Sequence, residues 1–380
     1  MMKNNKLGLY IHIPFCVRKC YYCDFLSAAA TEEIMTDYCH LLCREMALWK
    51  DDPRIRGKEV DTVFIGGGTP SLLSTENISL IIGSLYDNFT VVKEPEFSLE
   101  CNPGTVTKEK LQCYRQLGVN RLSIGMQSAI DDELLKLGRI HTYEEFVKTF
   151  HMARDVGFTN INIDVMAAIP GQTVDSYRTT LQRVLELKPE HISSYSLIIE
   201  EGTPFYERYA DEPPVDEDTD REMYEWTERL LAQAGYERYE IPNYAREGYS
   251  CKHNLKYWQR EEYLGLGLGA SSFLGNERFS NVRFFDAYEG KVSAGEMPVM
   301  ETETLTSEEE MAEFMYLGLR CMKGISGEEF EQCFGVKLKD IYGEVIEKLT
   351  GQGLLTEKEG QIALTKRGID VSNLVFAEFV

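Results

Sequence analysis

The sequence is short of basic residues. Its 40 Lys and Arg residues stand against 62 Asp and Glu residues, which leaves a formal net charge of −22 at pH 7. A surface field of this sign repels nucleic-acid phosphates and anionic lipid headgroups. We therefore expect no nucleic-acid partner.

Long apolar runs are also lacking. No segment approaches the roughly 18 consecutive apolar residues that a membrane-spanning helix needs. Residues 1–9 lack the apolar stretch and the small-residue cleavage site of a signal peptide. We therefore expect a cytoplasmic location, in which thiols stay reduced and clustered cysteines bind metal rather than pair. The 380-residue chain is 43% hydrophobic, which is enough to bury a sizeable core.

Short apolar runs rich in Val, Ile and Phe alternate with helix-like segments as far as about residue 200. The expected strands are Leu7–Ile13, Val60–Ile65, Glu96–Glu100, Arg121–Gly125, Asn160–Ala167 and His191–Ile199. The expected helices are Thr31–Lys50, Ser74–Asn88, Thr107–Leu117, Tyr143–Val156 and Thr173–Leu187, with Ser74 and Thr107 as capping residues. This order predicts an α/β fold with a parallel sheet and helical crossovers. Six such units are two fewer than a closed eight-fold barrel has, so a partial (β/α)6 barrel and a flat doubly wound sheet both fit.

The chain divides into three expected domains. Residues 1–200 form the αβ-repeat domain, and residues 201–304 form an acidic connector with an extension that flanks it. Residues 305–380 combine helices with a short hairpin, which predicts a small winged-helix-like domain. Polar and glycine residues gather just after the expected strands of the first domain, where the functional residues of such folds lie.

Three cysteines within eight residues follow the first expected strand: Cys16, Cys20 and Cys23. Thiolates at this spacing converge on one metal centre if the loop folds around it. A closed structural zinc site normally has four protein ligands, and Phe25 stands at the next plausible position. Iron–sulfur clusters also normally use four cysteines, and a set of three leaves one iron open for another ligand.

The Cys-x3-Cys-x2-Cys spacing, preceded by Tyr10-Ile-His-Ile-Pro-Phe-Cys16, resembles the radical S-adenosylmethionine (SAM) superfamily. The match is narrower to its HemN/HemW branch, which holds oxygen-independent coproporphyrinogen III oxidases and heme chaperones. The resemblance covers nearly the whole chain. It implies a partial (β/α)6 radical SAM barrel, with a [4Fe–4S] cluster on Cys16, Cys20 and Cys23 and SAM on the open iron.

Further residues near the expected strand ends suit a bound SAM molecule. The glycines of Gly66-Gly67-Gly68-Thr69-Pro70 let the backbone approach a small charged ligand closely. By the same resemblance, Glu100 and Arg139 serve the methionyl end, while Gln127 and Asp164 lie near the ribose. The full set of SAM candidates is Tyr10, Tyr22, Gly67, Gly68, Thr69, Glu100, Gln127, Arg139 and Asp164.

Two functional classes compete within this branch. The oxidases carry a further cysteine where this chain has Phe25, and a substantial N-terminal extension where only nine residues precede Tyr10. The acidic composition also gives no sign of a basic pocket for a tetracarboxylate porphyrinogen. The motif H-N-x-x-Y-W resembles one that marks the chaperones, which makes His253, Asn254, Tyr257 and Trp258 heme candidates. Without that resemblance, a structural histidine is the simpler reading of His253.

We therefore predict a heme chaperone that carries a SAM-coordinated [4Fe–4S] cluster, with decarboxylation of coproporphyrinogen III as the alternative. Its predicted partners are heme and a heme-accepting protein. An electron donor such as flavodoxin or ferredoxin joins them if SAM is cleaved, and the resemblance allows a homodimer. The run Gly265-Leu-Gly-Leu-Gly-Ala270 matches a dinucleotide-binding pattern, but no buried strand is expected before it and it lies beyond the six-unit core. It is interpreted as a late loop beside the SAM site, with Ser271 as a weak candidate.

Overall fold

Six parallel strands form the centre of the computed structural model, which describes residues 5–380. Residues 1–4, where the expected first domain and the segment considered as a signal peptide begin, lie outside the described residues. The strands are β1 (Lys6–Ile13), β2 (Glu59–Gly67), β3 (Val91–Cys101), β4 (Arg121–Gln127), β5 (Ile161–Ala167) and β6 (His191–Ser196). The connecting helices are α1 (Glu32–Trp49), α2 (Thr75–Asn88), α3 (Lys108–Gln116), α4 (Asp131–Leu137), α5 (Tyr143–Val156) and α6 (Val174–Leu187).

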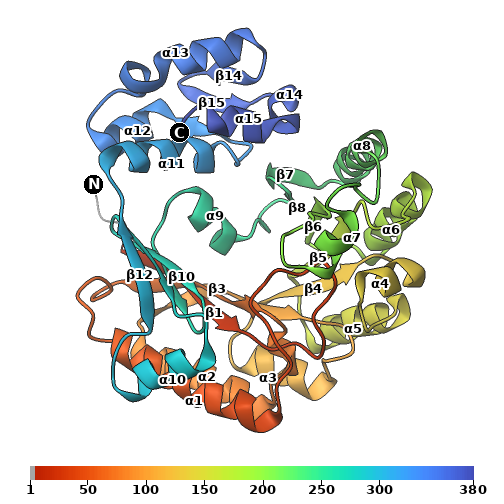
Figure 1. Cartoon of the computed structure of the whole chain (residues 1–380), viewed down its shortest axis with the longest axis vertical. Coiled ribbons are helices and arrows are strands. Elements are labelled where there is room, and N and C mark those ends of the chain that lie inside the picture. Colours follow the sequence, from red (N-terminus) through yellow and green to blue (C-terminus); the bar gives the residue numbers. More distant parts are fainter. Residues whose placement is uncertain (1–4) are drawn as a thin grey trace.

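The order of these strands identifies the architecture. Each strand from β1 to β6 pairs in parallel with the next one along the chain. A doubly wound sheet would reverse its strand order at a switch point, whereas here the order runs without reversal. The connecting helices lie along the outer side of the curved sheet (Figure 1). Of the two geometries that the sequence allowed, the partial (β/α)6 barrel is confirmed.

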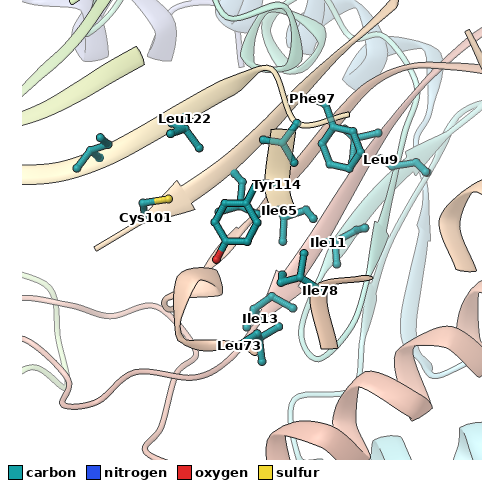
Figure 2. Close-up of a cluster of buried hydrophobic side chains, with 14 of the residues drawn as sticks. Leu9, Ile11, Ile13, Ile65, Leu73, Ile78, Phe97, Cys101, Tyr114 and Leu122 are labelled. Carbon is teal, nitrogen blue, oxygen red and sulfur yellow. The ribbon is translucent and has the colours of Figure 1, made fainter. Parts of the chain in front are cut away.

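The alternation of side chains along β1 shows how the barrel is filled. Leu9, Ile11 and Ile13 are fully buried and pack with Ile78 of α2 and Tyr114 of α3 in the layer between sheet and helices (Figure 2). Burying each such aliphatic side chain contributes roughly 1.5–3 kcal/mol. The alternate positions of β1 face the barrel interior, so polar side chains there are available for the site.

Two of the predicted helix starts are confirmed by their caps. The Ser74 hydroxyl accepts a hydrogen bond from the Asn77 amide at 3.2 Å, and the Thr107 hydroxyl accepts one from the Lys110 amide at 3.3 Å. The last predicted strand is shorter than expected, because β6 ends at Ser196. After the Leu197 amide bonds the Ala167 carbonyl, the chain leaves the sheet toward the barrel mouth.

Strands from residues 201–304 extend both edges of this sheet to twelve strands. Two short helices, α7 (Pro204–Tyr209) and α9 (Lys252–Trp258), and two longer ones, α8 (Glu217–Gln233) and α10 (Phe285–Ser293), lie in the same stretch. The added strands are β7 (Glu237–Glu240), β8 (Asn243–Ala245), β9 (Tyr263–Leu266), β10 (Ser271–Leu274), β11 (Glu277–Asn281) and β12 (Val299–Thr304). β8 pairs with β6 in the antiparallel direction, and β9 pairs with β1 in the parallel direction. The glycine run lies outside the six βα units, as expected, but Gly265 and Leu266 belong to β9, which extends the sheet beside β1.

The C-terminal segment has a hydrophobic core of its own, which includes Met315, Phe330, Ile346 and Phe376. Its elements are α11 (Ser307–Gly318), β13 (Ile325–Ser326), α12 (Gly327–Phe334), α13 (Leu338–Gly351), β14 (Leu355–Lys358), β15 (Gln361–Leu364), α14 (Lys366–Asp370) and α15 (Ser372–Ala377). Three helices followed by a β14–β15 hairpin give the winged-helix-like order that the sequence predicts. Across residues 5–380, no helix is both long and apolar enough to cross a membrane.

Candidate functional site

A cavity of about 580 Å³ opens at the carboxyl ends of the parallel strands. Its lining includes every predicted cluster and SAM residue except Tyr10: Cys16, Cys20, Cys23, Tyr22, Gly67, Gly68, Thr69, Glu100, Gln127, Arg139 and Asp164. Residues more than a hundred positions apart in the chain meet there because parallel strands bring their carboxyl ends to one edge of the sheet.

The three cysteines are positioned by a loop that is closed on itself. The Cys16 amide bonds the Ala28 carbonyl at 3.0 Å, and the Ala28 amide bonds the Pro14 carbonyl at 2.9 Å. Within the loop, the Cys23 amide bonds the Cys20 carbonyl at 3.3 Å. A ring nitrogen of His12 lies 2.9 Å from the Leu26 carbonyl and ties the loop to β1. We call residues 14–28 the cluster loop.

The three thiols of this loop are the candidate metal ligands. All three cysteines are free, and burial together with the neighbouring Cys20 and Cys16 raises the pKa of Cys23 to about 11. Metal binding must therefore release a proton there. Among the residues that the structure describes, no three His, Cys, Asp or Glu side chains are placed to hold one metal ion. In a [4Fe–4S] cluster each cysteine binds a different iron, so its ligands need not converge on a point.

The glycines after β2 allow close packing against the cluster loop. Gly67 has φ +109°, and a Cβ atom on it would lie 2.4 Å from the ring of His12. A Cβ atom on Gly68 would lie 2.6 Å from the Phe15 carbonyl oxygen. The Gly67 amide also donates to the Glu100 carboxylate at 2.9 Å. Larger residues would therefore push this turn away from both the cluster loop and Glu100.

A carboxyl group and a guanidinium group both line the cavity. Burial, with the nearby Asp164 as a second cause, raises the pKa of Glu100 to about 8. Arg139 is buried, donates to the Gly125 carbonyl at 2.8 Å and places Nη1 3.8 Å from the Cys20 sulfur, while its Nε lacks a partner within the described residues. A buried carboxyl group and a buried guanidinium complement the ammonium and carboxylate of an amino-acid ligand.

Asp164 and Gln127 present oxygen atoms on the neighbouring strands. Asp164 accepts from Asn162 at 2.7 Å, and burial raises the pKa of its carboxyl group. Gln127 has the uncommon φ of +69° and accepts from the Tyr195 hydroxyl at 2.9 Å. Such oxygens suit hydroxyl groups of a ligand.

Two cavity residues were missed by the sequence interpretation. The side-chain amide of Asn102 donates to the Thr69 hydroxyl at 3.1 Å, and its oxygen accepts from Arg139. Asn102 follows the end of β3 directly, so its position after a strand could have identified it as a cavity residue. Tyr195 lies within β6, where an inward-facing tyrosine has the same pattern as an ordinary core residue.

Tyr10 lies deeper in the barrel than the cavity lining. Its hydroxyl lies 2.9 Å from Nδ1 of His12, and its ring lies 6.4 Å from the Phe64 ring. It thus contacts the residue that anchors the cluster loop. Ser271 lies on β10, exposed and paired with Ser280, and does not line the cavity.

The H-N-x-x-Y-W motif forms α9, which fills the barrel interior several residues before the strand ends. His253 is 1% exposed. One ring nitrogen lies 2.9 Å from the Thr62 hydroxyl and the other 2.8 Å from the Tyr257 hydroxyl, and the ring stacks on Phe64 at 5.4 Å. Burial, then the charges of Lys256 and Arg121, lowers the pKa of His253 to about 3.

The rest of the motif also stays outside the cavity. Asn254 is half-buried on α9. Trp258 lies under the guanidinium of Arg320, 4.5 Å from its ring centre, where α9 meets the C-terminal segment. The structure therefore places the cluster and SAM candidates together and keeps the heme candidates apart from them.

Two family models match this chain. The radical SAM superfamily model matches residues 10–184, and the HemN C-terminal domain model matches residues 305–371. Heme chaperone HemW of Bacillus subtilis is 36% identical, covering 98% of each chain. The Escherichia coli HemW is 35% identical over 97% of this chain and 96% of its own.

One solved structure extends the comparison to the whole fold. The radical SAM enzyme coproporphyrinogen III oxidase (HemN) of E. coli superimposes with a TM-score of 0.87 and 25% identity. The match covers 98% of this chain and 89% of that one. The similarity to the HemW proteins is equally complete and higher in identity. The chain belongs to the HemW family of the radical SAM superfamily.

Proposed function

We propose that this chain is a heme chaperone, which binds heme and passes it to an acceptor protein. The observation that carries the proposal is its full-length similarity to proteins named heme chaperone HemW, at 36% identity for the B. subtilis protein. The oxidase HemN is 25% identical, and Phe25 stands where the resemblance gives the oxidases a further cysteine. Decarboxylation of coproporphyrinogen III is therefore the weaker alternative.

We further propose that the cavity holds a [4Fe–4S] cluster with SAM. Cys16, Cys20 and Cys23 would hold the cluster, and when bound, cluster and SAM supply one-electron chemistry at the sulfonium. Glu100 would accept a hydrogen bond from the ammonium group of the methionyl end of SAM. Arg139 would pair with the carboxylate of the same end. Both groups line the same cavity.

The remaining candidates would bind and enclose the same ligand. Gly67, Gly68 and Thr69 would cradle the amino group, and Gln127 and Asp164 would accept from ribose hydroxyls. Tyr22, which lines the cavity, would pack beside SAM and exclude water. Tyr10 would act indirectly, through His12 and the cluster loop.

Ligation of heme iron by His253 stays a prediction, and it would require His253 to give up its present hydrogen bonds. Both ring nitrogens already have hydrogen-bond partners, and the side chain is almost fully buried. A heme could reach it only after α9 leaves the barrel interior. The same holds for Tyr257, which shares this hydrogen bond, while Asn254 and Trp258 are partly exposed on α9.

The proposal includes partners and a location. Delivery of heme requires a heme-accepting protein, and cleavage of SAM would require an electron donor such as flavodoxin or ferredoxin. A homodimer and a cytoplasmic location belong to the same proposal.

The cluster is tested by anaerobic reconstitution with iron and sulfide. Cys20→Ala is expected to lose the cluster absorbance and bound iron, because one of three ligands is removed. Cys333→Ala, at an exposed cysteine of α12, is the matched control and should keep both. Wild-type protein that takes up zinc and no iron would contradict the cluster.

The function is tested by two assays on the same reconstituted protein. Heme titration should give saturable binding, and transfer of that heme to an apo-protein acceptor should follow. Incubation with coproporphyrinogen III, SAM and a reductant should give no protoporphyrinogen. Decarboxylation together with an absence of heme binding would favour the oxidase instead.

A further inference from the structure

Two large apolar side chains stand exposed at the mouth of the cavity. Phe25 of the cluster loop is 64% exposed, and Ile198, just after β6, is 66% exposed. Both line the cavity, although they come from opposite ends of the six-strand series. We call this pair the lip. Exposed apolar residues at a concave site are typical of ligand-binding positions.

The lip differs in chemistry from the cavity below it. The interior presents Glu100, Arg139 and Asp164, which complement a charged, hydrogen-bonding ligand such as SAM. Tyr22 is the aromatic side chain proposed to pack beside SAM, so Phe25 and Ile198 remain for another ligand. A flat apolar ligand can pack on a phenyl ring and a branched aliphatic chain at once. The lip is therefore suited to a second ligand that lies above the first.

Basic side chains lie beside the lip in an otherwise acidic protein. Arg18 and Lys19 line the same cavity and are exposed, and neither makes an ion pair within residues 5–380. One guanidinium nitrogen of Arg18 donates to the Gly138 carbonyl at 2.8 Å, which leaves its other nitrogens and Lys19 for a ligand. Asp24 and Glu200 line the cavity as well. This mixture disfavours a broadly acidic protein surface and favours a ligand with a few localised carboxylates.

We propose that heme docks at the lip, with its macrocycle against Phe25 and Ile198 and its propionates at Arg18 and Lys19. The inference rests on the proposed chaperone function and gives it a binding site. It leaves α9 in place, because the lip is already exposed while His253 is buried. It also gives Phe25 a role of its own at the position where the oxidases are expected to carry cysteine.

A protein docked on the lip is the main competing occupant. A stable protein interface buries roughly 800 Å² on each partner, far more than two side chains provide. Val17 and Ile140 are also exposed, but they line a second, small pocket and not the main cavity. The lip alone is thus matched to a small planar ligand.

The apolar contact is tested by heme titration of the reconstituted protein. Phe25→Ser and Ile198→Ser are each expected to weaken heme binding about tenfold, because each removes apolar area that heme would cover. Phe284→Ser is the matched control, since Phe284 is a 79% exposed phenylalanine away from the cavity. Cluster iron should be unchanged in all three variants. In Phe25→Ser the hydrogen bond to Cys23 is kept, because it comes from the backbone of residue 25.

The charged contact is tested by changing the ligand. Lys19→Gln should weaken binding of heme and make it less sensitive to salt, but should not change binding of heme dimethyl ester, which lacks the propionate charges. Equal losses for both ligands would show that Lys19 does not meet the propionates and would overturn that part.

The possible results distinguish failure of the lip as a heme site from failure of the proposed chaperone function. If wild type binds no heme, the proposed function fails and the lip fails with it. If wild type binds heme, and the lip variants match Phe284→Ser while His253→Ala loses binding, the function stands and the lip is overturned. If the lip variants keep heme affinity but slow reduction of the cluster by flavodoxin, the lip is a protein-docking site and the proposal is also overturned.

Discussion

At the scale of single residues, His253 shows how a reactive side chain is used as a structural one. Its two ring nitrogens are bonded to Thr62 and Tyr257, and its ring stacks on Phe64. Since the ring is neutral in this setting, one nitrogen donates and the other accepts. The residue thereby links α9 to β2, and this link is needed whether or not heme ever reaches it.

Replacing His253 with alanine should destabilise the protein by about 3 kcal/mol, because it leaves a cavity and two buried hydroxyl groups without partners. Urea denaturation of the metal-free protein measures this loss. His40→Ala, on the exposed side of α1, should have little effect. Equal stability of the two variants would contradict the structural role.

The same variant has a pH signature. The pKa of His253 is about 3 in the folded chain against 6.5 for a free histidine. Between these values the unfolded state binds a proton that the folded state does not, so this contribution to stability is lost as pH falls below 6.5. The gap between wild type and His253→Ala should therefore shrink by roughly 2 kcal/mol from pH 7 to pH 5. A constant gap would show that His253 titrates normally.

At the scale of elements, α9 depends on a carboxylate from another part of the chain. The two Glu96 oxygens accept from the amides of Lys252 and His253, both at 2.9 Å. These amides begin the helix and have no partner within it. Glu96 of β3 thus holds the start of α9 inside the barrel.

Replacing Glu96 with alanine should cost about 2 kcal/mol, since the buried His253 amide and the part-buried Lys252 amide lose their acceptor. Hydrogen exchange should rise in α9 before it rises in the parallel strands. Glu94→Ala, two residues earlier and exposed, is the matched control. Exchange that rises uniformly across the sheet, or not at all, would contradict a local anchor.

The elements differ in how far the sequence reveals them. Parallel strands buried on both faces give continuous apolar runs, and their helices begin at capping residues, so β1–β6 and their long helices could be predicted. The short, acidic α4 has too few periodic positions to stand out. Burial of Glu96 and His253 could not be predicted, because their partners lie more than 150 residues apart in the chain.

The site divides in the same way. Cys16, Cys20 and Cys23 are close in sequence, so spacing alone indicated a metal centre. Glu100 and Arg139 are far apart in sequence, so placing them in one site required the expectation that the ends of parallel strands meet. The lip could be found only from the structure, because Phe25 and Ile198 are far apart in the chain and line one cavity only after the sheet curves.

At the scale of the whole molecule, the twelve-stranded sheet is joined by buried carboxyl groups at distant points. Glu45 of α1 accepts from the Gly267 amide at 2.8 Å, from Asn281 at 2.7 Å and from the Tyr288 hydroxyl at 2.5 Å. These contacts fix the glycine run and the added strands against the first helix. Burial, only partly offset by these hydrogen bonds, raises the pKa of Glu45 to about 7.

This pKa makes the stability of the assembled sheet depend on pH. Glu45 has a pKa of about 7 when folded against 4.5 as a free side chain, so between these values the folded state keeps a proton that the unfolded state has lost. The resulting stabilisation is present below pH 4.5 and is lost as pH rises through 7. The free energy involved is about 3 kcal/mol.

Glu45→Gln removes this titration while keeping an acceptor oxygen for the Gly267 amide. The variant should gain about 3 kcal/mol relative to wild type between pH 4.5 and pH 7.5, whatever its stability at the starting pH. Urea denaturation of the metal-free protein across this range provides the measurement. Glu289→Gln, at an exposed position of α10, should follow the wild-type profile. If all three profiles run parallel, Glu45 is ionised throughout, and the junction of α1 with the glycine run is held as a charged site rather than a protonated one.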